Sequence, residues 1–361
     1  MRYLITGARF ALSEHIFRPH YDGGETFTSK AVGYTPEMLR RAYAFDDTVT
    51  GKGKSIAVIA ALDNVGLQEN INVFCEEFGL PTTEISVHYP DGRADVSSDN
   101  WLVESSLDTQ WAHVFAPDAK IFAVFAKSAL ADDLLSAAKY AVETLRADVV
   151  SMCFGSEESA RDGRLSGFMS ENGSVFTASS GDVGGEVFFP SSSPYCVSVG
   201  GTSLALNSSG TRRLSETAWI NSGGGASEIF EVPPYQGRFF NIYGMADGMR
   251  GTPDVSMMAN NNQGVPVYVS ELGGWTTAGG TSLACACFSG ICACIMEKHP
   301  DIKNSTDMLS YLYGKAGTTG YSRVQNSFND IILGKSGKYY AEEGWDFATG
   351  LGSPVIRQLL L

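Results

Sequence analysis

The most informative stretch of the chain is residues 120–154, KIFAVFAKSALADDLLSAAKYAVETLRADVVSMCF. The apolar run at 120–126 predicts a strand that is buried on both faces, and residues 147–154 predict a second one. Between them, residues 131–146 carry apolar side chains at helical spacing. This strand–helix–strand order is typical of a parallel sheet with right-handed crossovers, so we predict an α/β fold.

The same alternation continues on both sides of this unit. It predicts strands at 55–62, 84–90 and 174–181, and helices at 64–81, 101–116, around 159–171 and from Ser282 to about Lys298. We therefore expect a mostly parallel central sheet with helices on both faces. No linker long enough to divide the chain is present, so we expect one domain at 34–361 after a short N-terminal extension at 1–33.

Composition excludes several classes of protein. Lys and Arg number 26 against 40 Asp and Glu, and the net charge of −14 argues against a surface for nucleic acids or anionic membranes. No run approaches the roughly 20 apolar residues of a membrane span. Arg9 and Glu14 interrupt the first 17 residues, which therefore lack the apolar centre of a secretory signal.

Cysteine usage points to a reducing compartment. The chain has seven cysteines, an odd number, and four lie together in CACFSGICAC at 285–294. The spacing C-x-C-x4-C-x-C could indicate a thiolate metal site. However, Cys285 and Cys292 share one helix face while Cys287 and Cys294 share another, so we favour four small residues that pack a core helix.

A candidate nucleophile stands in GGTS at 279–282. Ser282 follows two glycines at the start of a buried helix, where backbone N–H groups and the helix dipole favour a developing negative charge. On this motif alone, a serine that merely caps the helix is the better interpretation. None of the five histidines, at 15, 20, 88, 113 and 299, has the setting of a subtilisin-type base.

A different base is available in NWLVESSLDTQWAH, residues 100–113. Glu104 and Asp108 are four residues apart, so they project from one helix face. Two carboxyls this close raise each other's pKa, and such a carboxyl can act as a general base in acid. The alternative is a solvated acidic face, but bulky apolar neighbours such as Trp101 and Trp111 disfavour it.

Together these motifs resemble the sedolisin, or serine-carboxyl peptidase, family from about Tyr34 to Pro354. The resemblance rests on YTPEMLRRAYAF, VESSLDTQWAHVFAPDAKIFAVFA, ASSGDVGGEVFFPSSSPYCVSVGGTSL, ETAWINSGGGASEIFEVPPYQ, RGTPDVSMMA, GGTS and the tail NDI…GWDFATGLGSP, all in the family's order. It implies a subtilisin-like fold with Ser282 as the nucleophile and Glu104 as the base. Asp108 would be the partner of Glu104, and Asp182 in SGD would be the donor in the oxyanion hole. A carboxyl helps there only when protonated, which implies activity in acid.

The resemblance also implies one structural calcium ion. Its ligands would be the carboxylates of Asp330 and Asp346 and the carbonyls of Ile331, Glu342 and Gly344, an oxygen-only set suited to a hard cation. The family usually has glycine at the place of Glu342, which a carbonyl ligand tolerates. Without the resemblance, an ordinary Asp/Gly-rich turn is the simpler interpretation.

Three features depart from the family pattern. The substrate-binding stretch, usually Ser-Trp-Gly, is Cys153–Phe154–Gly155, so contacts at the specificity subsites should differ. Only residues 1–33 precede the catalytic domain where a long prodomain is usual. The free cysteines and the lack of a signal favour an intracellular location, whereas family members are secreted or lysosomal.

We therefore expect a monomeric serine-type peptidase that acts on peptides or proteins, without binding nucleic acid or spanning a membrane. Both an endopeptidase and a tripeptidyl-type exopeptidase fit the sequence. The alternative is a catalytically silent relative that binds peptides or proteins through the same cleft. A pseudoenzyme is free to lose at least one of its four catalytic side chains, and all four positions are filled here.

Overall fold

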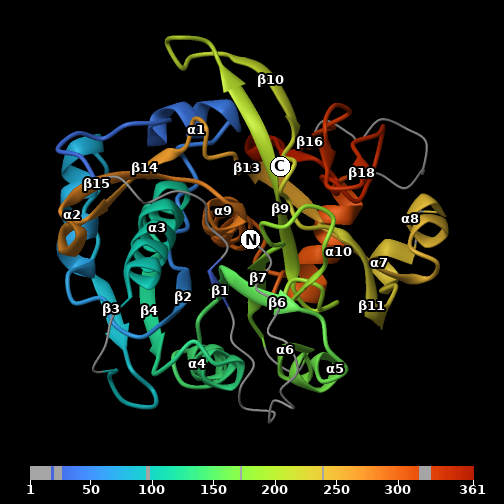
Figure 1. Cartoon of the computed structure of the whole chain (residues 1–361), viewed down its shortest axis with the longest axis horizontal. Helices are drawn as coiled ribbons and strands as arrows, with labels where there is room; N and C mark the ends of the chain where they lie inside the picture. The colour runs from blue at the N-terminus through green and yellow to red at the C-terminus, as the bar shows by residue number, and fades with distance from the viewer. Residues whose placement is uncertain (1–17, 20–26, 95–97, 171–172, 238–239, 317–326) are drawn as a thin grey trace.

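The computed structural model describes residues 18–19, 27–94, 98–170, 173–237, 240–316 and 327–361. One large sheet organises them (Figure 1). Its strands are β2 (Ser55–Ala61), β3 (Ile85–His88), β4 (Lys120–Ala126), β5 (Val149–Met152), β7 (Val175–Ser179), β9 (Val197–Leu206), β10 (Arg213–Ala218) and β13 (Val255–Met258). They follow the order β10-β9-β7-β5-β2-β4-β3, with β13 also beside β9. Only the β10–β9 pair is antiparallel, which confirms the predicted mostly parallel sheet.

Helices and short strands surround this sheet. The helices are α1 (Pro36–Ala42), α2 (Leu67–Phe78), α3 (Asp99–Phe115), α4 (Ala131–Glu143), α5 (Asp162–Leu165), α6 (Gly167–Ser170), α7 (Pro234–Gly237), α8 (Phe240–Met245), α9 (Thr281–Lys298), α10 (Ser305–Lys315), α11 (Ile356–Leu359) and the 3-10 turn η1 (Ser270–Leu272). One small sheet contains β1 (Arg18–Pro19), β6 (Phe154–Glu157) and β8 (Phe188–Phe189). The remaining pairs are β11 (Gly225–Glu231) with β12 (Met249–Thr252), β14 (Val265–Val269) with β15 (Gly274–Ala278), β16 (Phe328–Asn329) with β19 (Ser353–Pro354), and β17 (Lys335–Ser336) with β18 (Tyr339–Tyr340).

Local signals in the sequence explain several element boundaries. Helix α1 begins where the Thr35 side chain accepts a hydrogen bond from Met38 N, with Pro36 in its first turn. Helix α2 ends at Gly79, whose φ of 62° lies in the left-handed region. The central strand β2 is buried along six of its seven residues, as its unbroken apolar sequence predicts.

The central helices α3 and α9 are buried on every side. Every residue of α3 from Trp101 to Phe115 is buried, and so is every residue of α9 from Thr281 to Met296. The two helices pack closely because Gly290 leaves no side chain between them: a Cβ there would lie 2.7 Å from the Ala112 carbonyl oxygen. Helix α9 is long and apolar enough to cross a membrane, but it is the core helix of this fold, so no membrane span is implied.

The crossovers do not all share one hand. Helices α3 and α4 both pack on β2 and β4 without packing against each other, so they cover opposite faces of the sheet. The connections β3–α3–β4 and β4–α4–β5 nevertheless step in the same direction along the sheet. One of the two is therefore left-handed, and the prediction of uniformly right-handed crossovers is wrong. This arrangement brings α3 to the face that α9 covers.

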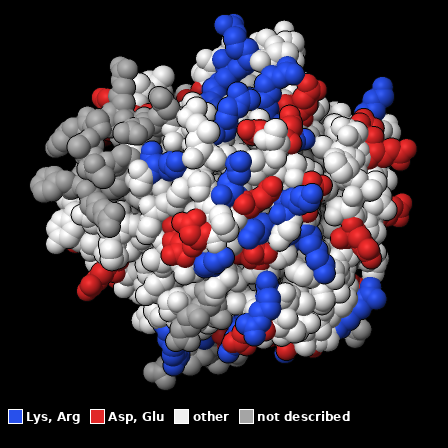
Figure 2. All heavy atoms as spheres, turned by 180° about the vertical axis from the view of Figure 1, so that it is seen from behind, with Lys and Arg blue, Asp and Glu red and all other residues white. Residues whose placement is uncertain are grey.

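Two predicted elements are interrupted in the structure. The strand predicted at 147–154 breaks at Cys153 into β5 and β6, because β6 leaves the main sheet to pair with β8 and β1. The helix predicted around 159–171 is two short helices, α5 and α6, that meet near Gly167. Figure 2 shows basic and acidic side chains interspersed over the face turned away from the viewer of Figure 1.

Candidate active site

Helix α9 presents Ser282 in its first turn. The helix begins at Thr281, one residue before the predicted start, and its N-cap is Gly280, whose φ of 91° favours glycine. The Ser282 hydroxyl does not cap the helix: it donates a hydrogen bond to the Cys153 carbonyl oxygen at 3.1 Å. Ser282 is fully buried, so its hydroxyl is held in one environment.

Helix α3 supplies two carboxyls to the same region. Glu104 and Asp108 are both 0% exposed, so the alternative of a solvated acidic face is wrong. One ligand atom each of Glu104, Asp108 and Cys153 lies within 4.8 Å of the other two. Within the described part of the chain, none of the four carboxylate oxygens has a hydrogen bond of standard geometry, although the Ser282 hydroxyl lies beside Glu104 and the Cys153 thiol beside Asp108.

Burial dominates the electrostatics of this pair. It raises the pKa of Glu104 well above the ordinary value, and the neighbouring charge of Asp108 raises it further. The Ser282 hydroxyl is close enough to lower the pKa of Glu104 against these effects, and Asp182 raises it. Burial likewise raises the pKa of Asp108, which the Cys153 thiol opposes. Since each carboxyl shifts the other, they titrate as a pair.

Asp182 lies at the N-terminus of α9. Its Oδ1 accepts hydrogen bonds from the backbone N of Thr281 at 2.9 Å and from the Thr281 hydroxyl at 2.7 Å. This contact ties the SGD loop after β7 to the residue preceding Ser282. A carboxyl at this position also faces the positive end of the helix dipole.

The described histidines form hydrogen bonds with residues other than Ser282. His88 pairs with the Ser86 hydroxyl at 3.0 Å, and His299 pairs with the Tyr311 hydroxyl at 2.8 Å. His113, although it lies on α3, contacts the Pro81 carbonyl oxygen at 2.7 Å. His15 and His20 lie outside the described residues. None of the three described histidines has a hydrogen bond to Ser282.

Residues 153–155 border the site as a strand edge. Cys153 and Phe154 are buried, and Phe154 and Gly155 begin β6. Strand β1 pairs with this edge in the antiparallel sense, Arg18 opposite Gly155 and Pro19 opposite Phe154, and it also lies near α3 (Figure 1). The edge that the sequence predicts as substrate-binding thus accepts an extended segment of the chain itself.

The chain is similar to known proteins in sequence and in fold. Residues 102–352 match the model of the subtilase family. Kumamolisin from Bacillus sp. (strain MN-32) is 30% identical over 91% of this chain. The chain belongs to the sedolisin family of subtilases. Sedolisin from Pseudomonas sp. (strain 101) is 30% identical over 52% of the chain, and tripeptidyl-peptidase sed1 from Aspergillus fumigatus is 31% identical over 49%.

The chain spans only part of those relatives: 63% of kumamolisin, 34% of Pseudomonas sedolisin and 31% of tripeptidyl-peptidase sed1. Among solved structures, Pseudomonas sedolisin complexed with two molecules of pseudo-iodotyrostatin superimposes with a TM-score of 0.80. That match covers 92% of this chain and 98% of the other at 23% identity, which establishes the shared subtilisin-like fold.

A second cluster of carboxyls lies in the C-terminal loop. Asp330 Oδ2 accepts a hydrogen bond from Gly344 N at 3.0 Å, and Asp346 Oδ2 accepts one from Glu342 N at 2.8 Å. Burial raises the pKa of Asp346 to about 7 and raises that of half-buried Asp330. Asp330 Oδ1 is buried with no donor among the described residues. One loop, 342–346, therefore connects both carboxylates.

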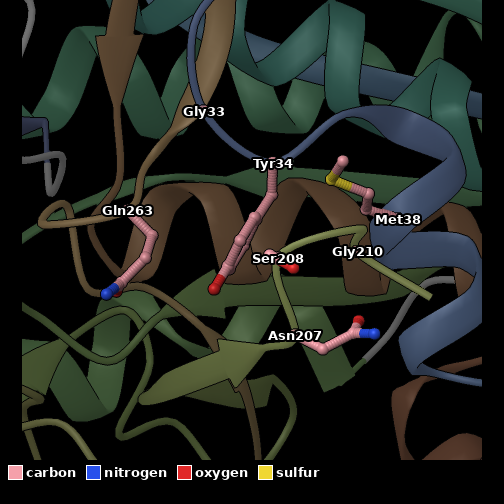
Figure 3. A pocket seen from close by; sticks show the side chains of 7 residues that line it. All are labelled: Gly33, Tyr34, Met38, Asn207, Ser208, Gly210 and Gln263. Atoms are coloured by element: carbon pink, nitrogen blue, oxygen red, sulfur yellow. The ribbon is translucent and has the colours of Figure 1, made fainter. Parts of the chain in front are cut away.

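The pocket in Figure 3 lies away from both clusters. Its volume is about 270 Å³, and it is lined by Gly33, Tyr34, Met38, Asn207, Ser208, Gly210 and Gln263. It includes none of the predicted site residues, so it is distinct from the candidate active site. The four cysteines of α9 are buried and free, which is consistent with the packing interpretation.

Sequence reasoning missed two residues of this site. Thr281 holds Asp182 through its backbone and its hydroxyl, and the GGTS motif contained it without indicating that role. Cys153 was predicted only as a substrate contact, whereas its thiol lies with Glu104 and Asp108. The cysteine in the place of the family's usual serine was the available signal.

Proposed function

We propose that the chain is a serine-carboxyl peptidase, which hydrolyses peptide bonds at acidic pH through an acyl-enzyme. The observation that carries the proposal is the contact between two buried helices, with Ser282 on α9 close to the Glu104–Asp108 pair on α3. A serine hydroxyl needs a base to become a nucleophile, and a buried carboxyl is a stronger base than an exposed one.

The proposed reaction begins with a turn of the Ser282 hydroxyl from the Cys153 carbonyl towards Glu104. Glu104 takes the hydroxyl proton as Oγ forms a bond to the substrate carbonyl carbon. Asp182, protonated, donates to the resulting oxyanion. Glu104 then gives its proton to the leaving amine, and the C–N bond breaks. Water hydrolyses the acyl-enzyme by the same steps.

Asp108 is a positioning residue in this scheme. Its charge raises the pKa of Glu104, so Glu104 binds the serine proton more strongly than an isolated carboxyl would. Because Asp182 must keep its proton while Glu104 loses one, activity requires a pH window and falls towards neutrality. This is the physical reason for proposing an acid peptidase.

The proposed substrate is a peptide or protein bound as an extended strand on β6. The support is the antiparallel pairing of Arg18–Pro19 with Gly155 and Phe154, which is the geometry that a peptide would adopt there. Residues 18–19 would then leave this edge when substrate binds. The silent peptide-binding alternative is not favoured, since the site keeps Ser282, Glu104, Asp108 and Asp182.

We also propose one structural calcium ion in the 330–346 loop. Two desolvated carboxylates joined by one loop, together with the donor-free Asp330 Oδ1, fit a hard divalent cation. Asp330 and Asp346 would hold it with the carbonyls of Ile331, Glu342 and Gly344. The ion would offset the charge repulsion of the buried carboxylates.

A peptide-library digest at acid pH, read by mass spectrometry, tests the activity and distinguishes endo-cleavage from release of tripeptides. Ser282→Ala should abolish turnover. Ser289→Ala is the matched control, because Ser289 is a buried serine on the same helix that bonds to Ser151 and Cys285 instead. Asp182→Asn should be slower, with activity that persists to higher pH. Proteolysis that survives in Ser282→Ala would contradict the proposal.

A further inference from the structure

The proposed reaction leaves the Cys153 thiol without a role. Its sulfur lies within 4.8 Å of a carboxylate oxygen of both Glu104 and Asp108, and all three residues are fully buried. The neighbours of the sulfur are weak partners: the Ser282 carbonyl oxygen at 3.5 Å and the Ser151 hydroxyl at 3.6 Å. Buried polar atoms usually have better partners than these.

The carboxyls in this cluster are also incompletely used. None of their four oxygens has a hydrogen bond of standard geometry within the described residues. The donors beside them are the Ser282 hydroxyl, next to Glu104, and the Cys153 thiol itself, next to Asp108. Once deprotonated, a thiol and two carboxyls that converge in this way form the donor set of a metal site.

We propose that Glu104, Asp108 and Cys153 bind a zinc ion, and that the bound ion holds the peptidase inactive. Zinc takes thiolate and carboxylate ligands at about 2.0–2.3 Å in a tetrahedron. Neighbouring ligand atoms are then roughly 3.5 Å apart, so the ligand atoms, which lie within 4.8 Å of one another, need to approach by at most about 1.3 Å. The thiolate selects zinc over calcium and magnesium, which prefer oxygen.

The inhibitory effect follows from Glu104. A carboxylate bound to zinc cannot accept the Ser282 proton, so this consequence rests on the proposed function, whereas the binding of the ion does not. Ser282 is as buried as the three ligands. We therefore expect zinc to reach the cluster by the same opening of the cleft that admits a peptide to Ser282.

The other titratable groups that face the three ligands are Asp182 from the loop after β7 and Cys285 from α9. Neither is cationic, so no positively charged side chain among the groups that face the cluster competes with a metal ion for the two carboxylates.

The test uses the full chain, freed of metal with a chelator and then kept in excess calcium to fill oxygen-only sites. Cobalt(II) chloride is the optical probe, because a thiolate ligand gives a charge-transfer band and a tetrahedral site gives visible absorption. We expect one such site, from which zinc chloride displaces cobalt. Cys153→Ser should lose the charge-transfer band and bind zinc at least about tenfold more weakly.

Two further variants keep the test decisive. Glu104→Gln removes a ligand without touching the thiol and should also weaken zinc binding. Cys75→Ser, another buried cysteine on α2, is the matched control and should bind as the parent does. A parent protein without the band, or a Cys153→Ser variant with an unchanged band and zinc affinity, would overturn the proposal.

The peptidase assay separates this proposal from the proposed function. We expect zinc to inhibit peptide cleavage and chelator to restore it. If the band depends on Cys153 but no cleavage is found, the zinc site stands and the peptidase assignment fails. If cleavage occurs but no metal binding depends on Cys153, the zinc proposal fails and the peptidase assignment stands.

Discussion

The contact between α3 and α9 can be tested through Gly290. Gly290→Ala adds a Cβ that would lie 2.7 Å from the Ala112 carbonyl oxygen and 2.8 Å from Phe115 Cβ. Carbon contacts are normally about 3.5–4.0 Å, so the helices must separate by roughly 0.5–1 Å. Such overpacking costs about 1–3 kcal/mol. Replacing glycine in a helix gains up to about 1 kcal/mol.

The cost of overpacking should exceed the gain in helix propensity. The net loss of about 1–2 kcal/mol corresponds to a fall in Tm of roughly 1–3 °C for a chain of this size. The effect on kcat should be larger, because the same movement separates Ser282 from Glu104, and a displacement of about 1 Å can cost on the order of 100-fold. Activity should therefore fall out of proportion to stability.

The matched control is Gly314→Ala on α10, where an added Cβ meets nothing within 4 Å. It should leave kcat unchanged and raise stability slightly, by up to about 1 kcal/mol. Thermal unfolding and peptide cleavage measured on both variants check the prediction. If Gly290→Ala behaves like Gly314→Ala, close packing of the two helices does not position the site.

Three other changes have expected outcomes. Arg250→Met should lower the free energy of unfolding, measured with denaturant, by about 3–5 kcal/mol. The variant leaves Asp254 buried without the guanidinium that now bonds to it at 2.6 and 2.8 Å. An unchanged unfolding midpoint would contradict this. Asp330→Ala, or excess chelator, should lower Tm if calcium binds only the native state, and a Tm that calcium does not affect would exclude the ion. Deleting residues 1–26 removes β1 from the edge of β6, where the substrate is proposed to bind, so KM should fall while kcat stays constant. An unchanged KM would mean that peptide does not bind at the edge of β6.

The sequence predicted the sheet and the helices that carry the site, because apolar runs and helical spacing are local signals. Glu104 and Asp108 were predictable as a pair for the same reason. Their bulky apolar neighbours argued against a solvated face, but the burial of α3 on every side was not predicted, because it depends on the other elements that surround the helix. The break at Cys153 and the left-handed crossover depend on pairing between distant segments, which a local pattern does not contain. Thr281 and the Cys153 thiol gained their contacts only when α9, β6 and α3 came together.

The central claim is that Glu104, coupled to Asp108, is the base for Ser282. Because the charge of Asp108 raises the pKa of Glu104, the neutral Asp108→Asn lets Glu104 ionise at lower pH. The acid limb of kcat/KM should therefore move to lower pH than in the parent, while Asp133→Asn on α4, outside the site, should leave it in place. Measuring kcat/KM against pH for the three proteins tests this directly. An acid limb that Asp108→Asn does not move, or a parent optimum at or above neutrality, would contradict the account.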